Sequence, residues 1–329
     1  MRLVAVGGSD AGISAALRAR ELDPTSDVTV VVADTYPNFS ICGIPYYISG
    51  EVTHWRDLAH RTCADLEATG MRLRLDTTAT SIDVAGQRVA VRDPHGISGW
   101  LEYDELVVGT GALPVRPPIS GLDQLGPDDG VHLLHSMGDT FALTRTLDTM
   151  HPSTALIVGA GYVGLEMAEG LTTRGLQVTQ VEMLPEVLPT VDPALGALIH
   201  AELNKHAVDV HTRSTVTAIT RAPGRRAPLH VDGTGPDNQL LGWDVDLVLV
   251  VVGVRPDTDL LAPPVPRPGH AARWSSTRPW PPSCRTFGRP ETALLPTTNF
   301  SASPTCRLAP QRTSRVALPA RTPSAGRAT

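Results

Sequence analysis

Residues 154–182 read TALIVGAGYVGLEMAEGLTTRGLQVTQVE, and they carry the most specific structural signal in the chain. The apolar run 154–158 predicts a strand, residues 165–174 carry helix formers, and residues 177–182 predict a second strand. Between the first strand and the helix lies Gly159-Ala160-Gly161-Tyr162-Val163-Gly164, a complete G-x-G-x-x-G pattern. Such a turn brings the N–H groups of the helix to a pyrophosphate, so the stretch predicts a dinucleotide-binding Rossmann unit.

Glu182 follows Gly164 by 18 residues, at the end of the second expected strand. A carboxylate about 20 residues beyond such a turn accepts hydrogen bonds from the 2′-hydroxyl of an adenosine ribose. It would repel a 2′-phosphate, so this second glycine turn (residues 159–164) predicts NADH in preference to NADPH. The alternative is an exposed charge at the end of a strand.

A similar arrangement opens the chain, where a strand over 3–6 and a helix over 11–21 flank Gly7-Gly8-Ser9-Asp10-Ala11-Gly12. Because Ser9 replaces the middle glycine, this first glycine turn (residues 7–12) fits a dinucleotide site or a plain turn between strand and helix. Asp34 lies 22 residues beyond Gly12, and it is either an acceptor for a ribose hydroxyl or a solvated loop aspartate.

Cys42 lies in Phe39-Ser40-Ile41-Cys42-Gly43-Ile44-Pro45-Tyr46-Tyr47, shortly after the first Rossmann opening. A thiol beside an electron-rich cofactor can hold a mixed disulfide, a persulfide or a sulfenic acid. The alternative is an inert buried cysteine. The other cysteines are Cys63, which we expect to be a half-buried helix residue, Cys284 and Cys306. Their spacing predicts neither a disulfide nor a metal site.

Several of these motifs recur in one known family and in the same order. They are the first glycine turn, the Cys42-Gly43-x-Pro45-Tyr46 element, Leu106-Val107-Val108-Gly109-Thr110-Gly111-Ala112-x-Pro114, the second glycine turn and Gly253-Val254-Arg255-Pro256. From residue 1 to about 262 the chain therefore resembles the flavin-dependent pyridine nucleotide-disulfide oxidoreductases. Within them it is similar to the single-cysteine branch of coenzyme A-disulfide reductases, NADH oxidases and peroxidases, and persulfide or polysulfide reductases.

The resemblance implies a path for electrons from NADH through FAD to Cys42, and then to a small disulfide, persulfide or oxygen species. It implies that FAD is bound by Gly7, Gly8, Gly12, Thr110 and Gly111, with the backbone near Ala79 meeting the adenine. It implies that NADH is bound by Gly159, Gly161, Gly164 and Glu182, with Tyr162 and Glu166 near the nicotinamide.

The chain also departs from the family pattern. Ile41 and Asn38 stand where coenzyme A-disulfide reductases usually have Asn and Ser, which counts against coenzyme A as the acceptor. Asp10 stands where peroxidase and oxidase members have a His that donates a proton, so peroxide chemistry of that type lacks its usual proton donor.

Besides the disulfide or persulfide reductase, two alternatives are kept. One is a water-forming NADH oxidase in which Cys42 cycles through a sulfenic acid, and the other is a non-catalytic, truncated nucleotide-binding product.

The expected fold is α/β, with two Rossmann-like domains of the three-layer ββα type. Outside the two glycine turns, the sequence also predicts a helix over 53–70 and a strand over 245–252. We expect an FAD-binding domain over 1–118, an NADH-binding domain over 119–250 and a returning segment of the FAD domain over 251–263. Residues 264–329 are rich in Pro, Ser, Thr and Ala, and residues 265–329 hold ten arginines and one acidic residue. We expect a disordered tail there.

The tail also bears on what the chain contains. A reading one base out of register permits family-like segments over 274–293 and 303–322, so a frameshift near residue 264 would leave the chain without the family's homodimerisation domain. The alternative is a basic arm for nucleic acid, disfavoured because interleaved aromatic residues are missing. No apolar run approaches the roughly 18 residues of a membrane span, and a cytoplasmic protein with neither membrane nor nucleic-acid partner is expected.

Overall fold

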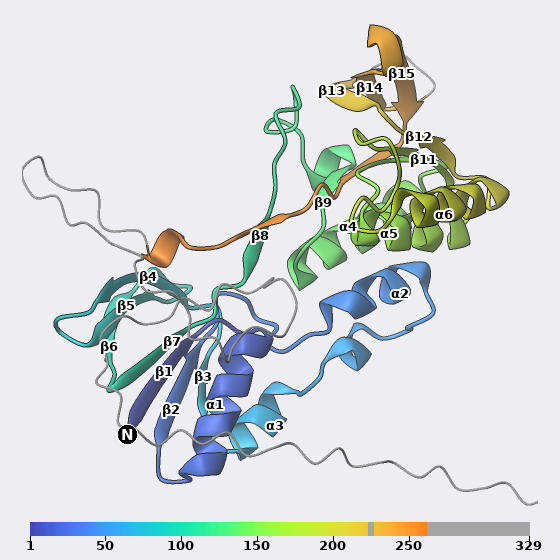
Figure 1. The fold of residues 1–329 in the computed structure, drawn as a ribbon. Coiled ribbons are helices and arrows are strands. Elements are labelled where there is room, and N and C mark those ends of the chain that lie inside the picture. The colour runs from blue at the N-terminus through green and yellow to red at the C-terminus, as the bar shows by residue number, and fades with distance from the viewer. Residues whose placement is uncertain (223–226, 262–329) are drawn as a thin grey trace, which may run out of the picture. The chain divides into compact units, whose positions relative to one another are not determined.

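The computed structural model describes residues 1–222 and 227–261, shown in colour in Figure 1. All of these residues belong to one compact unit. The predictions for the tail, including its disorder, the shifted frame, Cys284 and Cys306, lie outside the described residues.

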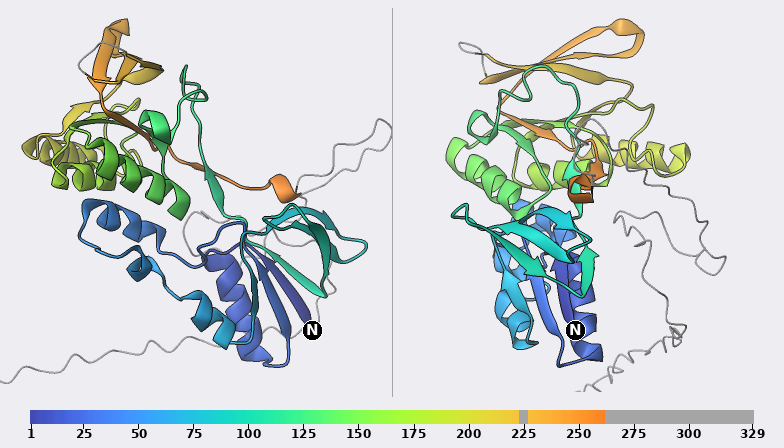
Figure 2. Two further views of the ribbon diagram at one scale, coloured as in Figure 1. Left: turned by 180° about the vertical axis from the view of Figure 1, so that it is seen from behind. Right: turned by 90° about the vertical axis from the view of Figure 1, so that its left-hand side faces the viewer.

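The N-terminal part is built on a parallel sheet with the order β3-β2-β1-β7. Side chains alternate between its faces: Leu3 packs with Ile13 of the helix α1, whereas Val4 packs with Val89 of an antiparallel sheet. Figure 2 shows the helix and the antiparallel sheet on opposite faces of the parallel sheet. The bounds are β1 (Arg2–Val6), α1 (Asp10–Leu22), β2 (Asp27–Val31), β3 (Arg72–Arg74), β4 (Thr78–Asp83), β5 (Arg88–Arg92), β6 (Ser98–Glu102) and β7 (Glu105–Val108).

The following part repeats these layers around a five-stranded parallel sheet with the order β12-β11-β10-β16-β9. Ala155 and Ile157 face the helices, whereas Leu156 and Val158 face an antiparallel sheet. The bounds are β9 (Val131–Leu133), α4 (Met137–Met150), β10 (Thr154–Val158), α5 (Tyr162–Thr173), β11 (Gln177–Val181), α6 (Pro193–Lys205), β12 (Asp209–His211), β13 (Thr215–Arg221), β14 (Leu229–Thr234), β15 (Leu240–Val245) and β16 (Leu247–Val250). The prediction of two Rossmann-like, three-layer ββα units is confirmed.

Two short strands pair antiparallel with each other: β8 (Ala112–Pro114), which follows β7, and β17 (Val254–Pro256), which follows β16. The short helix η5 (Asp259–Leu261) comes after β17. The remaining elements are η1 (Ile41–Gly43), α2 (Ile44–Ser49), η2 (Trp55–Leu58), α3 (Cys63–Ala68), η3 (Pro127–Asp129) and η4 (Pro236–Asn238). Since the described residues form a single unit, the domain boundaries at residues 118 and 250 stay predictions.

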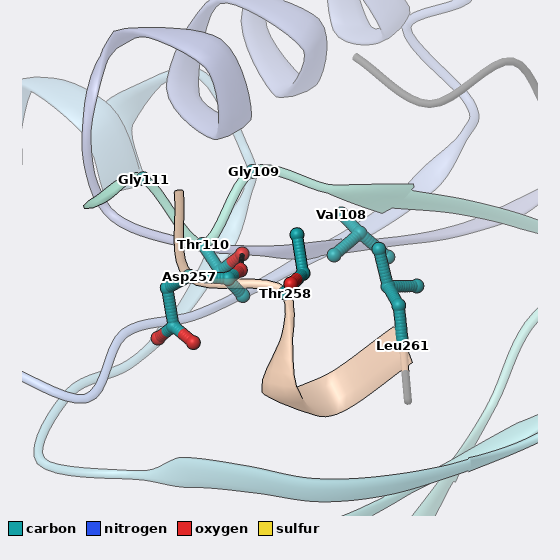
Figure 3. Close-up of a pocket in the computed structure, with 7 residues that line it drawn as sticks. All are labelled: Val108, Gly109, Thr110, Gly111, Asp257, Thr258 and Leu261. Carbon is teal, nitrogen blue, oxygen red and sulfur yellow. Dashed lines mark hydrogen bonds between the residues drawn. The ribbon is translucent and has the colours of Figure 1, made fainter. Parts of the chain in front are cut away.

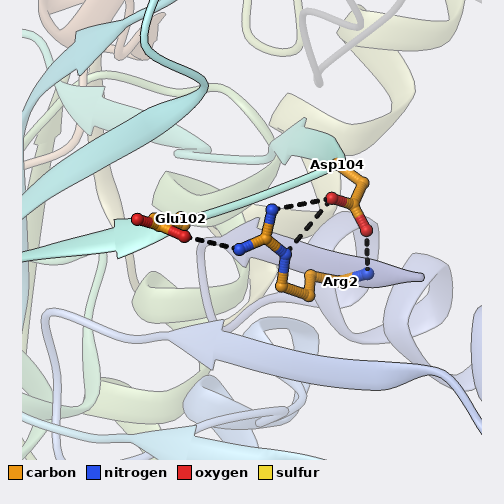
Figure 4. A network of polar contacts seen from close by, with 3 residues as sticks. All are labelled: Arg2, Glu102 and Asp104. Atoms are coloured by element: carbon orange, nitrogen blue, oxygen red, sulfur yellow. Dashed lines mark hydrogen bonds and ion pairs between the residues drawn. The ribbon is translucent and has the colours of Figure 1, made fainter.

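A charge cluster fastens the start of β1 to the strand β6 and the turn after it (Figure 4). The Arg2 guanidinium donates to Glu102 Oε2 at 2.6 Å and to Asp104 Oδ1 at 2.9 Å, and Asp104 Oδ2 accepts from the backbone N–H of Arg2 at 2.7 Å. The hydrogen bonds from Arg2 lower the pKa of Asp104. These groups are largely exposed, so the cluster sets register more than it adds stability.

The structure corrects two of the elements expected from sequence. A helix expected over 53–70 is instead η2 and α3, because Thr62 forms a capping box with Asp65 and starts a new helix there. A strand expected over 245–252 is interrupted at Asp246, which ends the antiparallel sheet and precedes β16. The Asp246 carboxylate accepts hydrogen bonds from the backbone N–H groups of Ser153 and Thr154, which ties the bend between β15 and β16 to the start of β10.

His132 in β9 is a buried histidine that makes stability depend on acid. It is 1% exposed, its Nε2 lies 3.0 Å from Thr146 Oγ1, and burial lowers its pKa to about 4, although Asp139 opposes the shift. The unfolded chain takes up this proton near pH 6.5 and the folded chain only near pH 4. The stability linked to this histidine is therefore fully present above pH 6.5, and it is lost as the pH falls from 6.5 towards 4.

We expect His132→Leu to reduce the loss of unfolding free energy between pH 7.5 and pH 5 by about 2 kcal/mol, measured by urea denaturation. His95→Leu is the control, because His95 is exposed. An unchanged pH dependence in the His132 variant would contradict this assignment.

Among residues 1–222 and 227–261, no helix combines the length and hydropathy needed to cross a bilayer. The same residues contain no group of three His, Cys, Asp or Glu side chains placed to hold a metal ion. The cytoplasmic location stays a prediction.

Candidate functional site

The second glycine turn follows β10, and two of its glycines are required by packing. Gly159 has φ +106°, and a Cβ added there would lie 2.6 Å from the carbonyl oxygen of Val251. A Cβ on Gly164 would lie 2.2 Å from the carbonyl oxygen of Gly159. At Gly161 a Cβ would meet nothing within 4 Å, so this position leaves open space where a ligand can approach the backbone.

Glu182 directly follows β11 and lies against this turn. Its Oε2 accepts a hydrogen bond from the N–H of Ala160 at 2.8 Å, and its Oε1 accepts one from the N–H of Leu184 at 2.9 Å. The residue is only 7% exposed, which excludes the alternative of an exposed strand-end charge. A carboxylate fixed in this way beside a glycine turn suits the hydroxyl groups of a ribose.

The first glycine turn has the same close packing. Gly7 has φ +119°, and its Cβ would lie 1.9 Å from the carbonyl oxygen of Gly109; a Cβ on Gly12 would lie 2.1 Å from the carbonyl oxygen of Gly7. Ser9, the N-cap of α1, makes no side-chain capping bond. An anionic pyrophosphate fits this helix start, since no side chain from the cap satisfies its N–H groups.

The Thr110-Gly111 turn lies against the chain after β17, and the two segments line a small pocket drawn in Figure 3. The Thr110 hydroxyl donates to the carbonyl oxygen of Asp257, and the N–H of Asp257 donates to the carbonyl oxygen of Gly111 at 2.9 Å. Gly111 has φ +74°. The same turn lies next to the first glycine turn, since the N–H of Gly109 donates to the carbonyl oxygen of Val6 at 2.7 Å and Gly109 packs against Gly7.

Asp34 and Ala79 lie further from the two glycine turns along the chain. Asp34 is half-buried, and its Oδ1 accepts from the N–H of Tyr36 at 3.2 Å. Ala79 lies in β4 opposite Val91, beside a register irregularity, and packs on the core between the two sheets. Their contacts to a nucleotide stay predictions.

Cys42 is exposed, which excludes the inert buried cysteine. It belongs to η1, and α2 begins two residues later. Ile48 of α2 packs with Met167 and Leu171 of α5, and Arg174 Nε donates to the carbonyl oxygen of Ile48 at 2.7 Å. The helix after the cysteine is thus fixed on the helix that starts at the second glycine turn.

Tyr162 and Glu166 lie one helical turn apart at the start of α5. Tyr162 is 59% exposed, and Glu166 is half-buried. Burial raises the pKa of Glu166, and the neighbouring Glu169 adds to the effect. Cys63, by contrast, is half-buried in α3 as expected, and burial raises the pKa of its thiol. A thiol that resists ionisation is a poor nucleophile, so burial disfavours a redox role for Cys63.

Asn38, which the sequence marked only as a departure from the coenzyme A-disulfide reductases, is a buried polar residue near the first glycine turn. Its side chain is 3% exposed, Nδ2 donates to Asp10 Oδ1 at 3.3 Å, and Oδ1 finds no hydrogen-bond partner among the described residues. Its N–H donates to the carbonyl oxygen of Gly8 at 2.7 Å. Asparagine tolerates its φ of +59°, but this tolerance by itself does not single out the position in a sequence.

An aromatic cluster between the cysteine segment and α4 was also missed. The rings of Tyr36, Phe39, Trp55 and Phe141 lie with centroids 5.2 to 5.9 Å apart, mostly edge to face. It joins residues more than 80 positions apart in the chain, which no local pattern indicates.

Comparison with known proteins adds a family. The model of the family "Pyridine nucleotide-disulphide oxidoreductase" matches residues 1–268. An NADH oxidase of Methanocaldococcus jannaschii is 31% identical over 262 residues, 79% of this chain and 56% of that protein. A CoA-dependent NAD(P)H sulfur oxidoreductase of Pyrococcus furiosus is 30% identical over 260 residues, 79% of this chain and 55% of that protein.

Solved structures agree with these matches. An NAD-dependent persulfide reductase from A. fulgidus is 30% identical, with a TM-score of 0.72 over 79% of this chain and 47% of that chain. A water-forming NADH oxidase from Lactobacillus brevis, solved with NADH bound, is 28% identical, with a TM-score of 0.72 over 79% of this chain and 55% of that chain. The chain spans about half the length of the curated relatives it matches.

Proposed function

Because the chain belongs to the pyridine nucleotide-disulphide oxidoreductase family, we propose that it passes electrons from NADH by way of FAD to Cys42 and on to a small disulfide, persulfide or oxygen species. The observation that carries this proposal is the exposed Cys42, positioned by a helix that packs on α5 beside the second glycine turn.

The first glycine turn suits FAD. Its pyrophosphate would lie at the start of α1, bound by the backbone of Gly7, Gly8 and Gly12, with Thr110 and Gly111 beside them. Glycine is needed at positions 7, 8 and 12, because a Cβ on Gly7 or Gly12 would collide with backbone and one on Gly8 with Val32. When bound, the flavin supplies the capacity to accept a hydride and release electrons in pairs.

The second glycine turn suits NADH. Gly159, Gly161 and Gly164 shape the backbone for the pyrophosphate, and Glu182 faces the adenosine ribose. Tyr162 and Glu166, at the start of α5, would lie towards the nicotinamide. The fixed carboxylate of Glu182 favours a free 2′-hydroxyl and opposes a 2′-phosphate.

We expect Glu182→Ala to weaken NADH binding about tenfold, because it removes charge-assisted hydrogen bonds to the ribose. NADPH binding should weaken less or improve, since the repelling charge is gone. Titrating both nucleotides against protein fluorescence measures this difference. Glu186→Ala is the control, because its carboxylate pairs with His200 in α6. Equal weakening of NADH and NADPH would contradict the role of Glu182.

Cys42 would act first as a nucleophile and then as a leaving group. Its thiolate would attack a disulfide or persulfide and release one thiolate of the substrate, which leaves a mixed disulfide or a persulfide on Cys42. Two electrons from NADH, passed by way of FAD, would then reduce this adduct and restore the Cys42 thiolate. A second candidate is water-forming NADH oxidation, in which Cys42 passes through a sulfenic acid. The similarity to the NADH-bound oxidase of Lactobacillus brevis favours including it.

Purified protein tests the proposal directly. Yellow protein with flavin absorbance that bleaches on addition of NADH supports it, and a panel of disulfides, persulfides and oxygen then identifies the acceptor. Protein that is colourless and stays so after incubation with FAD would instead support a non-catalytic nucleotide-binding product. A homodimer, which the family resemblance implies, stays a prediction.

A further inference from the structure

The two glycine turns have nearly the same backbone hydrogen bonding, so their residues can be matched one by one. In the first, Val6 pairs with Val31, and the N–H of Gly7 donates to the carbonyl oxygen of Val31 at 2.8 Å. In the second, Val158 pairs with Val181, and the N–H of Gly159 donates to the carbonyl oxygen of Val181 at 2.8 Å. Gly7 therefore corresponds to Gly159.

The match continues past the strands and assigns a counterpart to Glu182. The N–H of Glu182 donates to His211 and its carbonyl oxygen accepts from Ser214, at 2.8 and 3.0 Å. The N–H of Val32 donates to Arg74 and its carbonyl oxygen accepts from Thr77, both at 2.9 Å. Ser214 lies three residues beyond His211, and Thr77 lies three residues beyond Arg74. Val32 therefore occupies the position of Glu182.

Asp34 falls at a different position. The N–H of Asp76 donates to the carbonyl oxygen of Asp34, and the N–H of Arg213 donates to the carbonyl oxygen of Leu184. Asp76 and Arg213 share a left-handed backbone, with φ of +49° and +52°. Asp34 thus corresponds to Leu184, two residues beyond the position of the ribose-facing carboxylate.

The side chains at the matched position have opposite chemistry. Glu182 Oε2 accepts from the N–H of Ala160, whose counterpart in the first glycine turn is Gly8. Val32 Cγ1 lies 2.5 Å from where a Cβ of Gly8 would stand, and the valine is 3% exposed within the core under α1. Methyl groups therefore fill the place where the second turn presents a carboxylate.

We propose that Val32 is a specificity-determining residue of the nucleotide site at the first glycine turn, and that this site binds its dinucleotide without a protein carboxylate that contacts the adenosine ribose. The proposal rests on the assignment of this turn to FAD. A ribose diol at the first turn meets an apolar strand end, so its hydroxyl groups contribute little to affinity. The pyrophosphate contacts at the start of α1 carry most of it.

Introducing the missing carboxylate tests this. We expect Val32→Glu to tighten FAD binding about tenfold, because a charged acceptor gains hydrogen bonds to the diol. Val32→Gln, of similar size, should gain less, and Val32→Leu should gain nothing. Binding to the flavin-free full chain is measured by quenching of flavin fluorescence, with circular dichroism to confirm that each variant is folded.

Competition against FAD supplies a second readout, and its first part uses only the unmodified protein. ADP and 2′-deoxy-ADP should displace FAD from the unmodified protein equally well, whereas ADP should be the better competitor with Val32→Glu. Asp34→Ala should leave FAD affinity within about twofold of the unmodified chain.

The outcomes separate this inference from the proposed function. A folded Val32→Glu protein that binds FAD no more tightly, a clear preference of the unmodified protein for ADP, or a tenfold loss with Asp34→Ala would each overturn the inference while leaving the flavin site intact. Failure of both the unmodified protein and Val32→Glu to bind FAD would overturn the proposed function and the inference together.

Discussion

Cys42→Ser should lower turnover of disulfides or persulfides by roughly a thousandfold or more, while NADH still bleaches the flavin absorbance at a similar rate. A hydroxyl in place of the exposed thiol can neither form a mixed disulfide nor leave as a thiolate. The binding sites for both nucleotides are untouched, because the cysteine belongs to η1 rather than to a glycine turn. Stopped-flow absorbance separates the two half-reactions.

Cys63→Ser is the matched control, since Cys63 is the other cysteine among the described residues and is half-buried in α3. It should retain turnover within a few-fold. Undiminished disulfide turnover in Cys42→Ser would remove the thiol from the mechanism. A parallel loss of flavin bleaching would show instead that the substitution had disturbed the nucleotide sites.

Gly7→Ala should destabilise the protein by roughly 3 to 5 kcal/mol and abolish FAD binding. The added Cβ would lie 1.9 Å from a backbone carbonyl oxygen, at a φ of +119° that L-residues avoid. The position of a Cβ is fixed by its backbone, so no side-chain rotation can relieve its collision with the carbonyl oxygen of Gly109. The end of β1 and the 109–111 turn must therefore separate. Urea denaturation and flavin fluorescence measure the two effects.

Gly96→Ala separates strain from collision. Gly96 also has a positive φ, of +80°, but a Cβ there meets nothing within 4 Å. It should cost only about 1 kcal/mol and leave FAD binding unchanged. Similar destabilisation by the two variants would show that backbone strain, and not the contact with Gly109, explains the requirement for glycine.

The fold was largely predictable because its signals are local. The apolar run 154–158 and the glycines at 159–164 act over a few residues, so they indicated strand, turn and helix directly. The antiparallel strands β13 to β15 were not predicted, since short strands become recognisable only when their partners are known. The helix expected over 53–70 was wrong because a capping box at Thr62 starts a second helix there.

The site was predictable to a similar degree. Glu182 was identified by its spacing from Gly164, and it lies on the turn as expected. The same spacing argument applied to the first turn pointed to Asp34, whereas the backbone pairing aligns Val32 with Glu182. Spacing is a loose guide because the helix and loop between turn and strand differ in length, so only the hydrogen bonds between strands fix which residue corresponds to Glu182.

Local sequence patterns were enough to identify two glycine turns, each between a strand and a helix, and one cysteine in a segment typical of redox-active sulfur. Those features depend on backbone freedom and residue type within a few positions. The folded structure was needed to show that Cys42 is exposed, that α2 packs on α5 and that Val32 has, beside the first turn, the backbone position that Glu182 has beside the second. These depend on contacts between residues far apart in the chain, and only the folded backbone brings such residues together.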